Sequence, residues 1–205
     1  IALDLGSTTI AAHLCNLKTG EVINSSGVMN PQIKYGEDLM SRVSYAMMNK
    51  MGAKKMSMAV RAGINSLIES LCIDSNIEKK HVLEMVIVGN PVMHHLLLEI
   101  DPTELGQAPF ALSISQSITT NLNDLDISLN NNSKVYILPC IAGHVGADAA
   151  AVALSTSPDK STDTVLVIDV GTNAEILLGN KNKLLACSSP TGPAFEGAQI
   201  SCGQR

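Results

Sequence analysis

The sequence predicts a mixed α/β fold built from two similar units, the first complete and the second only begun. Ile1–Thr9 and Val167–Asn173 share one pattern: an apolar run, an Asp, one apolar residue, a Gly and a hydroxyl-bearing residue. Between these copies, strand-like runs alternate with segments of helical periodicity. The copies lie too far apart for a solenoid or propeller repeat, so they indicate a duplicated unit with a cleft between its halves.

The first unit opens with three strands. After the first Asp-x-Gly-Ser pattern, the run Ile10–Asn16 predicts a second strand, and a third follows at 21–28 after a turn at 17–20. Asn30-Pro31 then ends the third strand, because proline lacks the amide that a central strand needs. This order predicts an antiparallel meander.

Two helices follow the meander. Apolar residues at helical spacing predict the first at 39–48 and the second from about Ser57 to Cys72. In the second helix, Met58 falls on the apolar side and Arg61 on the polar side. We therefore expect Met58 in the core and Arg61 in solvent.

The rest of the first unit alternates strands and helices. Strands are predicted at 86–88 and 135–138, and a helix at 92–99 follows Pro91, which suits a first helical turn. The stretch 110–133 is rich in Ser, Asn and Thr and indicates a surface excursion with about one strand.

The lobe boundary is expected in a polar linker. A helix of small residues at 146–154 closes the first lobe, which we place at 1–157. The linker follows at 158–163, and the second lobe begins at 164–205, where we expect it to be truncated. This second lobe repeats the meander, with strands at 174–178 and 183–188 after the second Asp-x-Gly-Thr pattern.

The residue types in the two strand-to-strand turns suit phosphate binding. Gly6 and Gly171 lack a Cβ, so we expect backbone amides to approach phosphate oxygens and to adopt the φ values of an anion nest. Hydroxyl and amide side chains lie beside them in a set that we also expect to bind the ligand: Ser7, Thr8, Thr9, Thr172 and Asn173. A single such turn is weak support, because Asp and Gly are common in ordinary turns.

The carboxylates Asp4 and Asp169 precede these turns and would repel a bare phosphate. The role that fits them is to hold a hydrated Mg²⁺ ion, through water, between the protein and the phosphate oxygens. The sequence therefore predicts a magnesium–nucleotide site that needs both copies of the pattern.

Bulk properties exclude other classes of function. The 205 residues are 45% hydrophobic and 16% charged, with a net charge of −5 and no basic run, which argues against nucleic-acid binding. No apolar stretch is long enough to span a membrane. The five cysteines are scattered and include no Cys-x-x-Cys, which indicates reduced thiols in a cytoplasmic protein without an iron–sulfur cluster in this segment.

The order of elements describes a mixed sheet of the ribonuclease-H type with flanking helices. The paired hairpins and the small-residue helix resemble phosphate-1, connect-1 and phosphate-2 of the actin, Hsp70 and sugar-kinase superfamily, the ASKHA ATPases. That resemblance implies ATP as the ligand.

Several local strings carry a closer resemblance. They are Asn30-Pro-Gln32, Tyr35-Gly-Glu-Asp38 with Ser41-Arg42, Val88-Gly-Asn-Pro-Val-Met-His-His95, Leu138-Pro-Cys-Ile-Ala-Gly-His144-Val-Gly-Ala-Asp148, and Gly192-Pro-Ala-Phe-Glu-Gly197 with Ile200-Ser-Cys-Gly203. They are similar to the ATP-dependent reductive activators of corrinoid proteins. In that family an iron–sulfur domain, outside the ATP-binding one, passes an electron to Co(II) corrinoid on a partner protein. The resemblance implies ATP, Mg²⁺ and a corrinoid protein as ligands, allows a homodimer, and leads us to expect little activity from this segment alone.

The resemblance extends to three more site residues. Asp148 begins the small-residue helix and corresponds to a group that faces the γ-phosphate in sugar kinases, although a carboxylate there also simply suits a helix N-terminus. Asn90 follows a buried strand and could reach the cleft or form an ordinary strand-to-helix turn. Glu196 resembles a second-lobe residue near the nucleotide, or is a solvated loop carboxylate.

Two other functions remain open at the level of sequence. A small-molecule kinase of the sugar or acetate type would use Asp148 as the base for a substrate hydroxyl. A non-catalytic scaffold would bind partners under nucleotide control. The three functions differ in product: reduced corrinoid, a phosphorylated small molecule, or only a bound partner.

Overall fold

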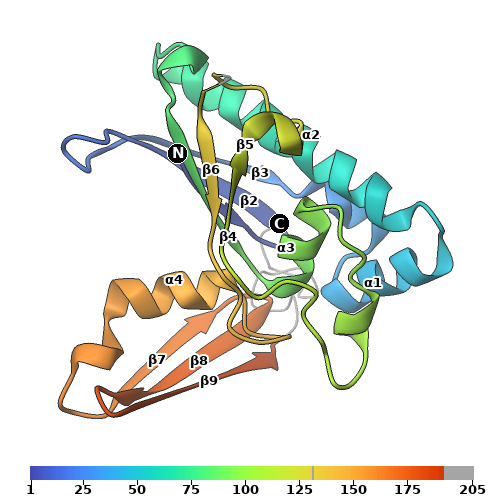
Figure 1. Ribbon diagram of the computed structural model, residues 1–205. Helices are drawn as coiled ribbons and strands as arrows, with labels where there is room; N and C mark the ends of the chain where they lie inside the picture. The colour runs from blue at the N-terminus through green and yellow to red at the C-terminus, as the bar shows by residue number, and fades with distance from the viewer. Residues whose placement is uncertain (131, 192–205) are drawn as a thin grey trace, which may run out of the picture.

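The computed structural model describes residues 1–130 and 132–191 and contains two sheets (Figure 1). The larger one has the strand order β3-β2-β1-β4-β6-β5. Its strands are β1 (Ala2–Leu5), β2 (Thr9–Cys15), β3 (Val22–Met29), β4 (Glu84–Gly89), β5 (Ile118–Asn121) and β6 (Lys134–Ile137). The first three form the predicted antiparallel meander, β4 and β6 run parallel to β1, and β5 is an antiparallel edge. The predicted mixed α/β sheet is confirmed.

The register of β1 against β4 determines where the first turn lies. Leu3 and Leu5 point into the core, with 2% and 1% of their surface exposed, so Asp4 points from the opposite face. Leu5 pairs with Gly89 in the parallel ladder. The carboxyl ends of the two strands therefore coincide, and the turn after β1 lies beside the residue after β4.

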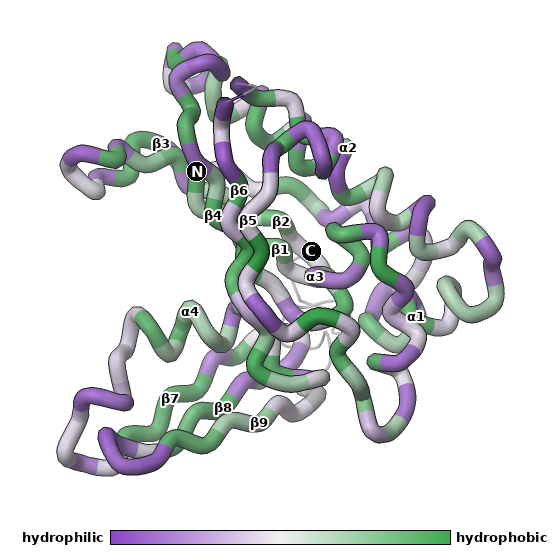
Figure 2. Tube along the Cα trace, in the orientation of Figure 1, coloured by the Kyte–Doolittle hydropathy of each residue, from purple (hydrophilic) through white to green (hydrophobic). Residues whose placement is uncertain are grey.

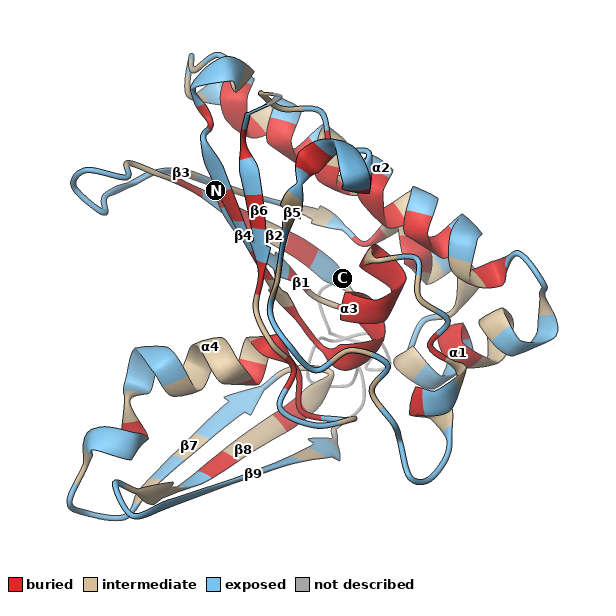
Figure 3. Ribbon diagram, in the orientation of Figure 1, coloured by how far each residue is buried: buried red, intermediate tan, exposed pale blue. Residues whose placement is uncertain are grey.

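Three helices accompany the larger sheet: α1 (Leu39–Met48), α2 (Gly52–Asp74) and α3 (Pro91–Leu97). In Figure 1, α2 runs along the sheet, and it contacts β2, β3 and α3. Its buried face consists of Met56, Val60, Ile64, Leu67, Ile68 and Leu71. Every residue of α3 is buried, which Figure 3 shows as a red helix beside the strands.

The prediction for the two sides of α2 was wrong at Met58 and Arg61. Met58 is 59% exposed, whereas Arg61 is only 7% exposed. The reason is a set of long-range contacts. Arg61 Nε and Nη2 donate to Leu97 O at 3.1 and 2.9 Å, and Arg61 Nη1 donates to the Asp126 carboxylate at 2.9 Å. Helical periodicity alone does not reveal those contacts. The helix also begins at Gly52, earlier than predicted.

The smaller sheet consists of β7 (Val165–Val170), β8 (Asn173–Asn180) and β9 (Lys183–Pro190), all antiparallel. The predicted small-residue helix is α4 (Ala147–Thr156), which contacts both β4 and β7 and so lies between the two sheets. Much of the smaller sheet is apolar in Figure 2 yet exposed or half-buried in Figure 3. Within the part of the chain that the structure describes, no helix has the length and apolarity to cross a membrane.

Candidate functional site

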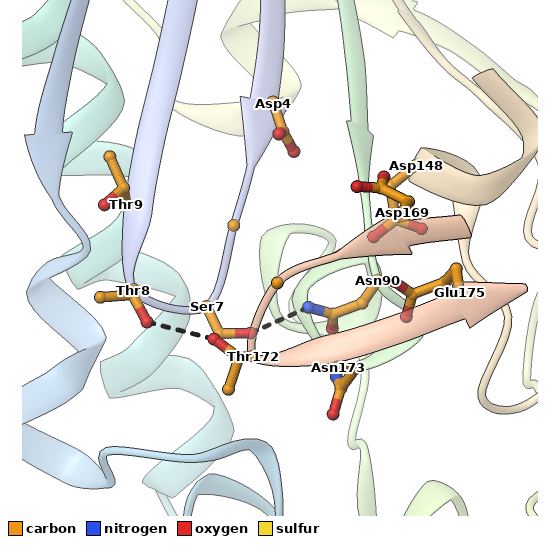
Figure 4. A pocket seen from close by; sticks show the side chains of 12 residues that line it. Asp4, Ser7, Thr8, Thr9, Asn90, Asp148, Asp169, Thr172, Asn173 and Glu175 are labelled. Carbon is orange, nitrogen blue, oxygen red and sulfur yellow. Dashed lines mark hydrogen bonds between the residues drawn. The ribbon is translucent and has the colours of Figure 1, made fainter. Parts of the chain in front are cut away.

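The two strand-to-strand turns meet at a cavity of about 240 Å³ (Figure 4). The hydroxyl oxygens of Thr8 and Thr172 lie 3.5 Å apart across it. The lining residues are Asp4, Gly6, Ser7, Thr8, Thr9, Asn90, Asp148, Asp169, Gly171, Thr172, Asn173 and Glu175. The fold thus brings together eleven of the twelve residues predicted from sequence. The twelfth, Glu196, lies outside the described residues.

The first turn requires glycine for steric reasons. A Cβ on Gly6 would lie 2.5 Å from the carbonyl oxygen of Thr9, a backbone atom that cannot move aside easily. Ser7 follows it and is 7% exposed. Its hydroxyl accepts a hydrogen bond from Asn90 Nδ2 at 3.1 Å. The turn is therefore tight and is tied to the end of β4.

The second turn is built differently, and the expected nest conformation is absent from both. Neither Gly6 nor Gly171 has a positive φ; the described glycines that do are Gly20 and Gly179. Gly171 has room for a Cβ, whose nearest neighbour would lie at 3.6 Å, and its amide donates to Asn173 O at 2.9 Å. The Gly171 amide is therefore already engaged within the turn.

Asn90 acts as a helix cap and as a link to the first turn. Its Oδ1 accepts from Met93 N at 3.0 Å and so caps α3, while its Nδ2 donates to Ser7. The sequence left two alternatives for Asn90, and the structure shows both: the residue forms an ordinary strand-to-helix turn and also lines the cleft. Its amide atoms are engaged in holding the first turn.

Four carboxyl groups line the cavity, and three of them hold protons more tightly than usual. Burial, with a contribution from Asp169, raises the pKa of Asp4. Burial also raises the pKa of Asp148 to about 6, helped by Asp4 and Asp169 and opposed by the hydrogen bond from Ala149 N. For Glu175, burial and the neighbouring Asp148 raise the pKa to about 7, opposed by a hydrogen bond from Ser188 Oγ.

This donor set fits a hydrated Mg²⁺ ion. The ion prefers oxygen ligands and retains several of its waters, and none of the residues lining the cavity is basic. Within the described residues, no three carboxylate, imidazole or thiol groups converge closely enough to hold a metal directly. That Asp4 and Asp169 hold the ion through water stays a prediction.

Glu175 is the one lining residue that the sequence prediction missed. It lies on β8, two residues after Asn173, and alternate residues of a strand point to the same side. Figure 4 shows its carboxylate on the same side of the cleft as Asp148 and Asp169. Strand alternation from Asn173 was the signal that could have identified it.

Matching hairpins on two sheets, facing one another across a cleft, define the two-lobed class that includes actin, Hsp70 and the sugar kinases. Within that class, the chain belongs to the RACo family. The family model for the RACo middle region matches residues 1–161, and that for the C-terminal domain of RACo, the ASKHA domain, matches residues 163–205. The resemblance inferred from the local strings is confirmed.

Curated relatives and a solved structure agree with this assignment. The chain is 35% identical to "Corrinoid activation enzyme RamQ" of Eubacterium limosum, covering 100% of this chain and 34% of the relative. It is 26% identical to "[Co(II) methylated amine-specific corrinoid protein] reductase" of Methanosarcina barkeri, covering 99% and 38%. A solved "Reductive activator for corrinoid,iron-sulfur protein" superposes with a TM-score of 0.95 at 38% identity, covering 99% and 32%. The chain thus spans about a third of the length of these relatives.

Proposed function

We propose that this chain is the nucleotide-binding part of a reductive activator that converts the Co(II) corrinoid of a partner protein to Co(I). The supporting observation is the cleft itself, where two hydroxyl-bearing turns from separate sheets face each other. One electron is required, and its source is an iron–sulfur domain outside these residues. The names of the relatives, a corrinoid activation enzyme and a Co(II) corrinoid protein reductase, support the same reaction.

In this proposal, ATP binds with its phosphates between the two turns. Ser7, Thr8 and Thr172 donate hydroxyl hydrogen bonds, and the amides of the first turn add backbone donors. Asp4 and Asp169 would hold a bound Mg²⁺ through water, and the ion would supply positive charge to the phosphates. Asp148 and Glu175, whose pKa values lie near neutrality, orient or deprotonate the attacking water.

We also propose that the chain divides into lobes at 1–157 and 164–205, with a hinge at 158–163. The described part of the second lobe contacts the first through α4 and the paired turns. Nucleotide binding between the turns would then favour lobe closure and so control docking of the corrinoid protein. The four described cysteines are all unpaired, which supports a reducing compartment such as the cytoplasm.

The test is to remove each magnesium-holding carboxylate in the full-length protein. Asp4→Ala and Asp169→Ala should each abolish measurable Mg-ATP binding in calorimetry, because the phosphates then face the remaining carboxylates without a held cation. Asp74→Ala, at an exposed position at the C-terminal end of α2, is the matched control and should bind like the parent. Parent-like binding by both cleft variants would refute the site.

A turnover assay distinguishes the activator from a kinase. With an iron–sulfur domain and reductant present, the corrinoid absorption spectrum should change from Co(II) to Co(I) only when ATP is added. Transfer of the γ-phosphate to a sugar or to acetate would instead favour the kinase function.

A further inference from the structure

The carbonyl oxygens of the first turn accept hydrogen bonds from buried donors behind it. Asn30 Nδ2 donates to Gly6 O and Asn30 N to Thr8 O, each at 2.8 Å. Between them, Arg42 Nη2 donates to Ser7 O at 2.5 Å. The C=O and N–H groups of a trans peptide point in opposite directions, so the amides that follow these carbonyls point away from the buried donors and toward the cleft.

Arg42 is a fully buried cation that has only neutral acceptors in contact. Besides Ser7, it donates to Gly36 O at 2.8 Å, to Gln32 Oε1 at 3.4 Å and to Met93 Sδ at 3.2 Å. Burial lowers its pKa to about 10, opposed by the charge of Asp38, so it remains protonated at neutral pH. Within residues 1–130 and 132–191, no carboxylate forms a salt bridge with it.

Arg61 is a second buried arginine, but its charge is paired with carboxylates. Its Nη1 lies 2.9 Å from the Asp126 carboxylate and 3.9 Å from that of Glu99. An unpaired buried charge is strongly unfavourable, whereas a paired one is largely compensated. Among the described residues, Arg42 has no such carboxylate in contact, so its positive charge, opposed only by the more distant Asp38, acts on the turn whose carbonyl it holds.

We propose that Arg42 is a positioning residue of the phosphate site, which fixes the Ser7–Thr8 peptide with its amide toward the cleft and supplies positive charge behind it. This inference rests on the proposed nucleotide function. It also accounts for the Asn30-Pro-Gln32 and Ser41-Arg42 strings, which contribute no residue to the cavity lining. These strings build the buried support of the first turn.

The test compares a ligand with phosphates and one without, using the full-length protein. Arg42→Met removes the guanidinium hydrogen bonds and the positive charge. Mg-ADP affinity should therefore fall by about 10- to 100-fold, the range for a hydrogen bond to a charged group. Adenosine affinity should change little. Arg42→Lys keeps the charge and should recover part of the loss. Arg61→Met, the matched control, should bind both ligands like the parent even where its unfolding temperature falls.

A second variant separates charge from folding. Gln32→Glu places a carboxylate against the guanidinium, which neutralises Arg42 while leaving it in place. Gln32 Nε2 also donates to Met56 O at 3.0 Å, and the variant loses this hydrogen bond, so its unfolding temperature should fall. Its Mg-ADP affinity should fall while its adenosine affinity stays close to that of the parent. Parent-like Mg-ADP binding by both Arg42→Met and Gln32→Glu would overturn the proposal, and so would equal losses for ADP and adenosine, which indicate a merely structural role. A parent protein that binds no Mg-ADP would refute the nucleotide function itself.

Discussion

At the scale of single residues, four carboxyl groups line the cleft, and burial disfavours the negative charge of three of them, Asp4, Asp148 and Glu175. The pKa of Asp148 is raised from 3.8 to about 6 and that of Glu175 from 4.5 to about 7. Without a ligand, both groups therefore carry protons over part of the range below neutrality. A cation bound there, as proposed, would displace those protons and so couple the site to pH.

The pH dependence of stability follows from these shifts. A raised pKa means that the folded state binds the proton more tightly than the unfolded state. The resulting stabilisation is fully present below the unfolded values and is lost as pH rises through about 6 and 7. Without Mg²⁺, the unfolding temperature should fall more steeply between pH 5 and pH 8 for the parent than for Glu175→Gln, as followed by circular dichroism at about four pH values.

Added Mg²⁺ should flatten the curve of the parent, because the ion favours the deprotonated carboxylates. Glu21→Gln, at an exposed position before β3, is the matched control and should keep the parent slope. Identical slopes for the parent and Glu175→Gln would show that Glu175 does not titrate in this range.

Sequence reasoning at this scale succeeded where one short pattern contains both the residue and its reason. The position of Asp4, Ser7 and Thr8 at the cavity can be predicted, because a strand, a tight turn and hydroxyl residues follow one another directly in the sequence. The burial of Arg42 cannot be predicted in this way, because it depends on contacts with Ser7, Gly36 and other residues that only the fold brings together.

At the scale of elements, the important junction is the start of α4 against the end of β4. A Cβ on Gly146 would lie 2.6 Å from Asn90 Cα and equally close to Gly89 O. Ala147 and Ala149 follow and are fully buried. Small residues therefore let the helix start approach the strand end closely, and this approach places Asp148 in the cavity.

Gly146→Ala should therefore disturb both stability and the site. The third atom at 2.6 Å is Asp148 Oδ1, but the other two are backbone and cannot rotate away. We therefore expect a loss of about 1–3 kcal/mol in the free energy of unfolding, as for overpacking. Mg-ATP affinity should fall as well, because Asp148 moves with the helix. Gly27→Ala is the control, since its Cβ would make only ordinary contacts at 3.5 Å. Denaturant melts and calorimetry check both, and equal behaviour of the two variants would contradict the packing argument.

Most elements were predictable, since α1 (Leu39–Met48) and the strands follow local patterns of apolar residues. The segment 110–133 was only partly predictable from the sequence. It contains the one expected strand, β5, but its Asp126 and Ser128 also form hydrogen bonds with Arg61 and Asn65 of α2. Those contacts join residues far apart in sequence, and no local periodicity encodes them.

At the scale of the whole molecule, the smaller sheet has an apolar face that no other part of the described chain covers. Its exposed side chains include Leu166 at 57%, Ile168 at 53%, Val170 at 56%, Leu178 at 42% and Leu185 at 53%. Leu166 pairs with Leu178, and Leu178 with Leu185, so these residues form a continuous strip across three strands. Such a strip is larger than the scattered apolar residues of an ordinary surface.

The 205-residue chain should accordingly bind the dye ANS through this strip. Replacing Leu166 and Ile168 together by Lys should lower the fluorescence of the bound dye, because the charges interrupt the apolar surface. Leu154→Lys, at a 74% exposed position on α4, is the control and should leave the fluorescence unchanged. An unchanged signal in the double variant would mean that the dye binds elsewhere.

The duplicated pattern predicted two units with facing turns, and the cavity between those turns agrees with it. The relative orientation of the sheets was not predictable, because it depends on how α4 packs against both β4 and β7. The identity of the ligand is likewise a matter of chemistry at the cavity rather than of the fold.

The near-contact between the hydroxyls of Thr8 and Thr172 bears on the kinetics of exchange. A phosphate group that is to lie between these side chains must first part them, and they belong to different sheets. Under the proposed function, arrival and departure of the nucleotide would then be limited by the separation of the two sheets rather than by diffusion. A slow dissociation rate would thus act as a timer for how long the closed form persists.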